Sequence, residues 1–147
     1  MRDSYSSFTT LIASINRKIH RLKVGVMAKF DLKRSHLSCI YYIHREGSVT
    51  PAGLCKLCGE DKANISRALK QLEDEGYVTR APRKSPRSRV YMTLTEKGGE
   101  IARMLSGDVD RMVGIASDGI PDEDIETMYR VLERIDGQLS STTDGKN

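Results

Sequence analysis

The sequence lacks several features that would indicate export, a membrane or catalysis. It has no apolar run as long as a signal peptide or a membrane span, and its first ten residues, MRDSYSSFTT, are polar. Its three cysteines are an odd number, so they cannot all pair within one chain. It has neither a Gly-rich phosphate loop nor a nucleophile motif near a histidine. These absences favour a cytoplasmic protein with reduced thiols, no membrane partner and no enzymatic activity.

The distribution of charge along the 147 residues is uneven, although the formal net charge is only +4. Residues 1–50 carry nine Lys and Arg against three Asp and Glu, and residues 62–97 carry nine against four. From residue 98 onward the ratio reverses, with five basic residues against eleven acidic ones. A chain of this length fits one domain with a core of its own. A polyanion such as double-stranded DNA would therefore meet only part of the chain.

Hydrophobic periodicity predicts that most of the chain is helical. Apolar residues recur at spacings of three and four from Tyr5 to Val26, which places them on one face of a helix of about six turns. A second helix fits LKRSHLSCIYYIHREG and ends at Gly47. Two further helices with apolar faces follow Thr95 and Pro121. The polar residues after these helices, 141–147, are expected to form a disordered tail.

A helix-turn-helix is expected between Thr50 and Gly76. Thr50 and Pro51 are favourable N-cap and first-turn residues, and Gly59 would end this helix after about two turns. Asp61 then caps a longer helix that runs through KANISRALKQLEDE. The two helices meet across a turn of roughly three residues that contains glycine, which is the spacing of a helix-turn-helix.

The pattern after Gly76 changes to that of β-strands. YVTRA and RVYMTLT are rich in β-branched and aromatic residues, and they flank PRKSPRS, whose prolines and serines predict a hairpin loop. A hairpin in this position is a wing. The predicted fold class is mainly α with a small β-hairpin wing. Its parts are an N-terminal dimerisation helix at 1–30, a winged helix-turn-helix lobe at 31–98, C-terminal dimerisation helices at 99–140 and the tail at 141–147.

The helix after the turn and the hairpin loop are the candidate DNA-binding elements. Asn, Ser, Arg and Lys on the exposed side of the helix are the residue types that reach base edges and phosphates in a major groove. An arginine at a hairpin tip can enter a narrow minor groove while its neighbours hold phosphates. An ordinary solvated surface is the alternative reading. The predicted DNA-binding residues are Lys62, Asn64, Ser66, Arg67, Lys70, Arg83, Lys84, Arg87 and Arg89.

The apolar stripes near both termini are longer than one compact winged helix needs. Paired with a second chain, they would form a helical dimerisation region. A symmetric homodimer would place its two DNA-reading helices in successive major grooves of a palindromic site. Packing within one chain is the alternative.

Cys55 and Cys58 form a Cys-x-x-Cys pair on the short helix before the turn. Free cysteine commonly packs as a small hydrophobe, and a zinc site would need four ligands. His36 or His44 could supply a further ligand. Packing is therefore the expected role and no metal or cofactor is predicted, while a thiol- or metal-responsive switch that uses Cys39, Cys55 and Cys58 is the alternative function.

Residues 54–98 resemble the winged helix-turn-helix of the MarR family, the multiple antibiotic resistance regulators. The most specific parts are DKANISRALKQLEDEGYV at 61–78 and LTEKG at 94–98. The resemblance implies a homodimeric transcription regulator, usually a repressor, that a small aromatic or phenolic ligand releases from DNA. It also implies an effector cleft between the dimerisation helices and the DNA-binding lobe, for which the candidate residues are Arg17, His20, Tyr41 and Tyr42.

The sequence departs from the family pattern in two places. The family wing usually carries Asp-x-Arg, in which the acid braces the arginine, whereas Pro86 and Ser88 occupy those places here. Arg87 or Arg89 would then substitute in a shifted register. Peroxide-sensing relatives carry a reactive cysteine in the N-terminal helix, but no cysteine precedes Cys39 in this chain. The resemblance therefore does not support redox sensing by that route.

Overall fold

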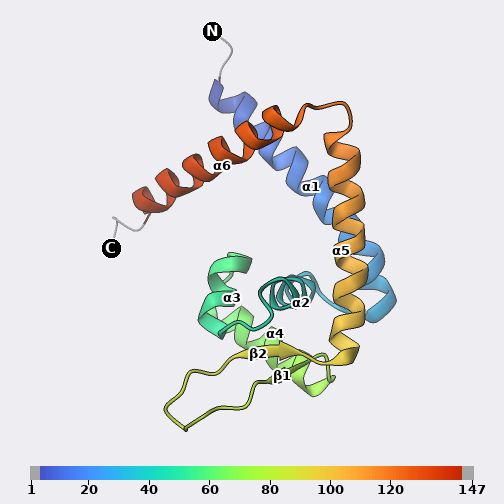
Figure 1. Cartoon of the computed structure of the whole chain (residues 1–147), viewed down its shortest axis with the longest axis vertical. Helices are drawn as coiled ribbons and strands as arrows, with labels where there is room; N and C mark the ends of the chain where they lie inside the picture. The colour runs from blue at the N-terminus through green and yellow to red at the C-terminus, as the bar shows by residue number, and fades with distance from the viewer. Residues whose placement is uncertain (1–3, 144–147) are drawn as a thin grey trace. The chain divides into compact units, whose positions relative to one another are not determined.

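A computed structural model describes residues 4–143 and shows a helical chain with one short β-hairpin (Figure 1). Its elements are α1 (Ser4–Phe30), α2 (Arg34–Glu46), α3 (Pro51–Cys58), α4 (Lys62–Asp74), β1 (Val78–Arg80), β2 (Met92–Leu94), α5 (Glu96–Ser117) and α6 (Asp122–Thr143). The predicted fold class, mainly α with a β-hairpin wing, is confirmed. Within the described residues, no helix is both long enough and apolar enough to cross a membrane.

The chain divides into two compact units, one that ends at Asp108 and one that begins at Val109. The first unit contains α1 to α4, the hairpin and the first part of α5. The second contains the rest of α5 and α6.

The helix-turn-helix begins and ends with the predicted caps. The Thr50 hydroxyl accepts the backbone N–H of Gly53 at 3.1 Å, and Pro51 is the first residue of α3. Gly59 ends α3 in the left-handed region, at φ 65°, where glycine meets no Cβ clash. Asp61 then caps α4 by accepting the backbone N–H of Asn64 at 2.7 Å. These caps fix the residues at which α3 ends and α4 begins, and so the length of the turn between the two helices.

The core of the first unit is a single apolar cluster with contributions from α2, α3, α4, β2 and α5. Its side chains that are less than 2% exposed include Leu37, Ile40, Ile43, Leu54, Ile65, Leu72, Met92 and Ile101. Met27 and Phe30, near the end of α1, pack against this cluster. Burial of each large aliphatic side chain contributes about 1.5–3 kcal/mol, so this cluster holds the helix-turn-helix together.

The hairpin is shorter than predicted. β1 and β2 pair antiparallel with Val78 opposite Leu94, and each strand has only three residues. One further bond, from the Ala81 N–H to the Tyr91 carbonyl at 2.8 Å, extends the ladder. Pro82 comes next and has no N–H to donate, so pairing stops and an open loop follows.

The start of α5 is joined to the chain that leaves α4. The Thr95 hydroxyl donates to the Gly76 carbonyl at 2.6 Å and accepts the Gly98 backbone N–H at 3.1 Å. The Thr95 N–H donates to the Tyr77 carbonyl at 3.1 Å. A Cβ atom added at Gly98 would lie only 2.0 Å from that same carbonyl oxygen. The glycine of LTEKG is thus required by the close approach of two backbones.

Lys97 adds a charged contact at this junction. Its Nζ donates to the Glu75 carbonyl at 2.8 Å, at the C-terminal end of α4. The same ammonium lies 4.2 Å from the centre of the Tyr77 ring. A cation is favourable at the negative end of a helix dipole and over an aromatic face. Lys97 therefore helps to fix the end of α4 to α5.

In the second unit, α5 and α6 are separated by a tight turn at Gly119, which has φ 74°. The predicted tail at 141–147 overlaps α6, because residues 141–143 are helical. The hydroxyls of Ser141 and Thr142 donate to the Gln138 carbonyl at 2.8 and 2.9 Å. They satisfy an acceptor of the last turn that would otherwise need water. Residues 144–147 lie outside the described part of the chain.

Replacing Gly98 with alanine is expected to destabilise the protein by about 1–3 kcal/mol, because the new methyl group would overlap the Tyr77 carbonyl. Gly99→Ala is the matched control, since the nearest atom to its Cβ is the flexible end of Arg103 at 3.5 Å. That control should be neutral or stabilising by up to about 1 kcal/mol. Urea unfolding followed by circular dichroism measures both, and equal stabilities would contradict the close contact.

Candidate nucleic-acid interface

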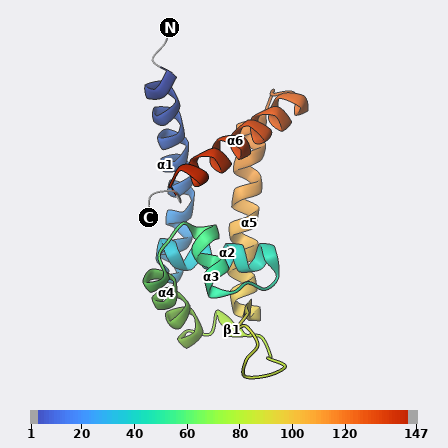
Figure 2. The same cartoon turned by 90° about the vertical axis from the view of Figure 1, so that its left-hand side faces the viewer.

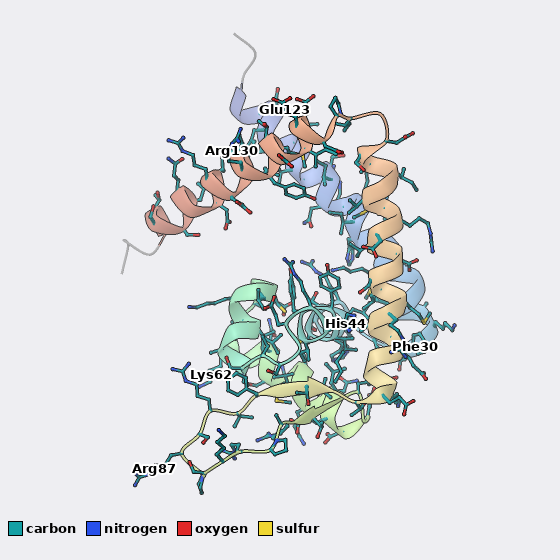
Figure 3. All side chains as sticks on the ribbon, in the orientation of Figure 1. Phe30, His44, Lys62, Arg87, Glu123 and Arg130 are labelled. Carbon is teal, nitrogen blue, oxygen red and sulfur yellow. The ribbon has the colours of Figure 1, made fainter. Side chains whose placement is uncertain are left out.

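The exposed face of α4 carries all five of its predicted DNA-binding residues. Ile65, Ala68, Leu69 and Leu72 of this helix are buried. The polar residues Lys62, Asn64, Ser66, Arg67 and Lys70 are all exposed. The alternation follows from helical periodicity, because the buried residues share one side. Figure 3 shows Lys62 at the beginning of α4, the end where the helix dipole is positive.

The polar side chains of α4 make only weak contacts with one another. The Arg67 guanidinium donates to the Asn64 side-chain oxygen. The Lys70 ammonium lies 3.4 Å from the Asp74 carboxylate, and both groups are largely exposed. An exposed pair of this kind contributes about 0–1 kcal/mol. These groups can therefore exchange their partners for bases or phosphates at little cost.

The hairpin loop presents the four remaining predicted residues. Arg83, Lys84, Arg87 and Arg89 are all exposed, and residues 81–91 contain no acidic residue. Figure 3 shows Arg87 at the outer end of the loop, pointing away from the helices, and Figure 2 shows the loop extending beyond the hairpin. Arg87 is therefore the candidate for insertion into a minor groove.

Hydroxyl and carbonyl groups brace the loop tip in place of the family's aspartate. The Ser85 and Ser88 hydroxyls lie 3.1 Å apart, and the Ser88 N–H donates to the Ser85 carbonyl at 3.1 Å. The Arg83 guanidinium donates to the Pro86 carbonyl at 3.4 Å. One guanidinium donor of Arg83 is therefore used within the loop. Arg87 lies at the apex of this closed turn.

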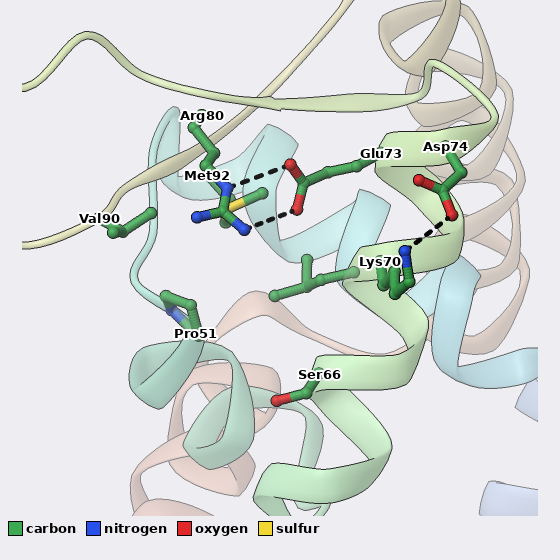
Figure 4. A pocket seen from close by; sticks show the side chains of 9 residues that line it. Pro51, Ser66, Lys70, Glu73, Asp74, Arg80, Val90 and Met92 are labelled. Atoms are coloured by element: carbon green, nitrogen blue, oxygen red, sulfur yellow. Dashed lines mark hydrogen bonds and ion pairs between the residues drawn. The ribbon is translucent and has the colours of Figure 1, made fainter.

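An ion pair that the sequence did not reveal ties the hairpin to α4. The Arg80 Nε lies 3.1 Å from the Glu73 carboxylate, and a second guanidinium nitrogen donates to it at 3.4 Å (Figure 4). The two residues are seven apart, across the end of a helix and the start of a strand, so no periodic pattern pairs them. Next to this pair is a hollow of about 370 Å³, lined in part by Ser66, Lys70 and Val90. The pair joins the two candidate DNA-binding elements.

His36 is the buried polar residue of the core in the described part of the chain. Its Nδ1 accepts the Lys33 backbone N–H at 2.9 Å, which caps the start of α2. Burial lowers its pKa, against the opposing effect of Glu75, so the ring stays neutral. This imidazole therefore caps the start of α2 and is committed to structure.

The candidate effector residues fall into two groups. Tyr41 and Tyr42 on α2 are half-buried against the core, with ring centroids 5.3 Å apart in an edge-to-face arrangement. Burial raises the pKa of Tyr42. On α1, Arg17 is exposed, and the Nδ1 of His20 is buried with no hydrogen-bond partner among the described residues. Their role as an effector site stays a prediction.

The histidines and cysteines do not gather into a metal site. Among residues 4–143, no group of three or more His, Cys, Asp or Glu side chains is placed to hold a metal ion. His44 is exposed, and His36 is engaged as described above. The metal-responsive form of the alternative function gains no support from this arrangement.

A model described as the MarR family matches residues 30–88, which contain α2, α3, α4, β1 and most of the loop. Over these residues the chain is similar to the MarR family. The resemblance drawn from DKANISRALKQLEDEGYV is confirmed, whereas LTEKG lies outside the matched residues.

Two curated relatives show how far the likeness extends. The HTH-type transcriptional regulator PetP of Rhodobacter capsulatus is 35% identical over 82 residues, which cover 55% of this chain and 49% of PetP. The uncharacterized HTH-type transcriptional regulator YybA of Bacillus subtilis is 24% identical over 124 residues, 84% of this chain and 83% of YybA. The chain thus spans about half the length of PetP. Both relatives are regulators, which agrees with the prediction that the chain is not an enzyme.

Solved structures of the MarR family share the fold at low sequence identity. A MarR/EmrR family transcriptional regulator from Acinetobacter has a TM-score of 0.79 at 15% identity, covering 96% of this chain and 99% of that one. NadR in complex with 4-hydroxyphenylacetate has a TM-score of 0.74 at 16% identity, covering 86% and 89%. The chain therefore shares the fold of these structures.

Proposed function

We propose that this MarR-family chain is a sequence-specific, DNA-binding transcription regulator in which α4 is the recognition helix and the hairpin loop is the wing. The observation that carries the proposal is the exposed basic surface shared by the two elements, which we call the DNA face. It comprises Lys62, Asn64, Ser66, Arg67, Lys70, Arg83, Lys84, Arg87 and Arg89. Such a surface gains affinity by releasing counterions from phosphates. A cytoplasmic location is part of the proposal, because the protein must reach DNA.

A homodimer is the second part of the proposal. On α1, Phe8, Ile12 and Ile15 are 38%, 42% and 52% exposed, and they line a shallow hollow of about 430 Å³. The side chains of Tyr5 and Val26, at the ends of the predicted stripe, lie outside the described part of the chain. In the second unit, Met128, Val131 and Leu139 of α6 are also about half exposed. Apolar side chains gathered on one helix face favour burial against a partner, and a second copy of the same chain offers the same faces.

The mode of action follows from the dimer and the family. Two recognition helices related by a two-fold axis would read a palindromic operator, with half-sites about one helical turn apart. Repression by occupation of that site is the expected action. The complex of NadR with 4-hydroxyphenylacetate supports a small phenolic or aromatic effector for this chain. Arg17, His20, Tyr41 and Tyr42 are the proposed contacts for that effector.

Arg67→Ala and Arg87→Ala are each expected to weaken operator binding by about 1–3 kcal/mol while the protein stays folded. The operator is obtained by selecting bound sequences from a random DNA pool, in which a palindrome is expected. Fluorescence anisotropy at several salt concentrations then measures the affinity. Arg45→Ala is the matched control, because Arg45 is exposed but lies on α2 outside the DNA face. Wild-type affinity in both test variants would refute the assigned DNA face.

Ile15→Asp is expected to dissociate the dimer, because a carboxylate would replace an apolar side chain at the proposed interface. Sedimentation equilibrium measures the change in mass. The control is Thr10→Asp, which adds the same charge at an exposed position on the opposite side of α1. A wild-type chain that sediments as a monomer would contradict the dimer.

Addition of 4-hydroxyphenylacetate is expected to release the protein from its selected operator. The phenol and carboxylate would bind polar groups such as Arg17 and His20, and the ring would pack near Tyr41 and Tyr42. Arg17→Ala should raise the ligand concentration needed for release and leave DNA affinity in the absence of ligand unchanged. Persistence of the wild-type complex at saturating concentrations of several phenolic acids would contradict this effector class.

A further inference from the structure

The two ends of the hairpin loop are held by different kinds of contact. At the β2 end, Met92 exchanges two backbone hydrogen bonds with Val49, at 2.8 and 3.1 Å, and is itself only 1% exposed. At the β1 end, the last strand residue is Arg80, whose guanidinium pairs with the Glu73 carboxylate of α4. The β2 end is therefore attached to the core, and a side-chain ion pair attaches the β1 end to α4.

The Arg80–Glu73 pair has a more defined geometry than its exposed neighbour on α4. The Arg80 Nε donates to one carboxylate oxygen at 3.1 Å, and a second guanidinium nitrogen donates to the other at 3.4 Å (Figure 4). The Glu73 side chain is 28% exposed, whereas Lys70 and Asp74 make a single contact at 3.4 Å and are 79% and 64% exposed. A two-point contact between a guanidinium and a carboxylate fixes direction as well as distance.

The position of Glu73 is unfavourable for binding DNA by charge alone. Residues 81–91 hold four basic residues and no acidic one, and the exposed face of α4 carries Lys62, Arg67 and Lys70. Two basic elements repel each other, and a carboxylate placed between them offsets that repulsion. The same carboxylate repels a polyanion. Glu73 is therefore expected to contribute to DNA binding through the arrangement of the hairpin loop and α4.

We propose that Glu73 and Arg80 are positioning residues, which hold the hairpin loop against α4 so that Arg87 and the recognition helix reach DNA together. The inference rests on the proposed function, because it assigns a role within that DNA-binding surface. Arg80 then acts through Glu73 and does not hold a phosphate, unlike the basic residues of the loop. Ordering the two elements before DNA arrives reduces the entropy lost on binding.

Removal of one or the other carboxylate of α4 tests the proposal by the sign of its effect. Glu73→Ala is expected to lower affinity for the selected operator about three- to tenfold, although it removes a negative charge. The matched control is Asp74→Ala, which removes the same charge from the next residue and releases Lys70, so its affinity should equal or exceed that of the wild type. A Glu73→Ala protein that binds DNA as tightly as the wild type, or more tightly, overturns the proposal.

Arg80→Lys distinguishes a positioning arginine from one that holds a phosphate. Lysine keeps the charge but lacks the planar fork that meets both oxygens of Glu73. A positioning role predicts a loss of affinity close to that of Glu73→Ala, with the salt dependence of the wild type. A lysine would serve almost as well as arginine in contact with a phosphate. Wild-type affinity of Arg80→Lys would therefore contradict the assignment.

A double-mutant cycle with Arg87→Ala shows whether Glu73 acts through the loop. If the loop is misplaced in Glu73→Ala, the Arg87 contact is already lost or weakened. The double variant should then bind DNA about as tightly as Arg87→Ala alone, so that the two losses are not additive. A change confined to α4 would make the losses additive, and that result would overturn the proposal.

Hydrogen exchange of the Ala81 amide tests the structural half of the proposal without DNA. This N–H donates to the Tyr91 carbonyl at 2.8 Å, directly after Arg80. Its exchange should become faster in Glu73→Ala and stay unchanged in Asp74→Ala, because loss of the pair frees the hairpin end to open. Unchanged exchange in Glu73→Ala overturns the proposal whatever the DNA affinity. Wild-type protein that binds no DNA would instead refute the proposed function, and the positioning role with it.

Discussion

Burial of one apolar cluster is the constraint on which the rest of this protein depends. Leu54 of α3, Ile65 and Leu72 of α4 and Met92 of β2 are all inaccessible in the same core. Each contributes about 1.5–3 kcal/mol, whereas an exposed ion pair such as Lys70 with Asp74 contributes about 0–1 kcal/mol. The core therefore decides the orientation of α4. Burial of the apolar face of this helix leaves its polar face exposed to solvent. The DNA face is thus a consequence of packing, and its charges are free to bind a partner.

A second constraint fixes the C-terminal end of α4. It is the close approach of the Gly98 and Tyr77 backbones. Thr95 and Lys97 reinforce it with hydrogen bonds to the carbonyls of Gly76 and Glu75. The recognition helix is therefore held at both ends, by Asp61 where it begins and by α5 where it ends. The hairpin starts from the same short segment, and the Arg80–Glu73 pair joins it to α4. A movement of α5 or of the turn before α4 would consequently change the spacing of the residues that are proposed to contact DNA.

The surfaces outside the winged helix-turn-helix lobe are apolar or acidic rather than basic. α1 and α6 expose apolar side chains such as Ile15 and Leu139, and the C-terminal third of the chain is acidic. The acidic C-terminal third would repel a polyanion, and the basic winged helix-turn-helix lobe would attract it. The exposed apolar faces favour contact with a second copy of the chain. The distribution of charge and of exposed apolar side chains along the chain therefore supports the proposal that DNA and a second copy of the chain contact different elements.

The sequence by itself determined the local elements and the class of fold. Caps at Thr50, Gly59 and Asp61, the 3.6-residue periodicity of α4 and the motif LTEKG act over a few residues, so their structural meaning can be read without the rest of the chain. The exposed residues of α4 followed from the same periodicity. The length of the strands was overestimated, because β propensity does not account for the point at which Pro82 ends the ladder. Only the tertiary structure decided that Arg80 pairs with Glu73 and that Arg87 is at the tip of the loop. Those contacts join residues from different elements, and their geometry depends on how the shared core packs, which no local pattern encodes.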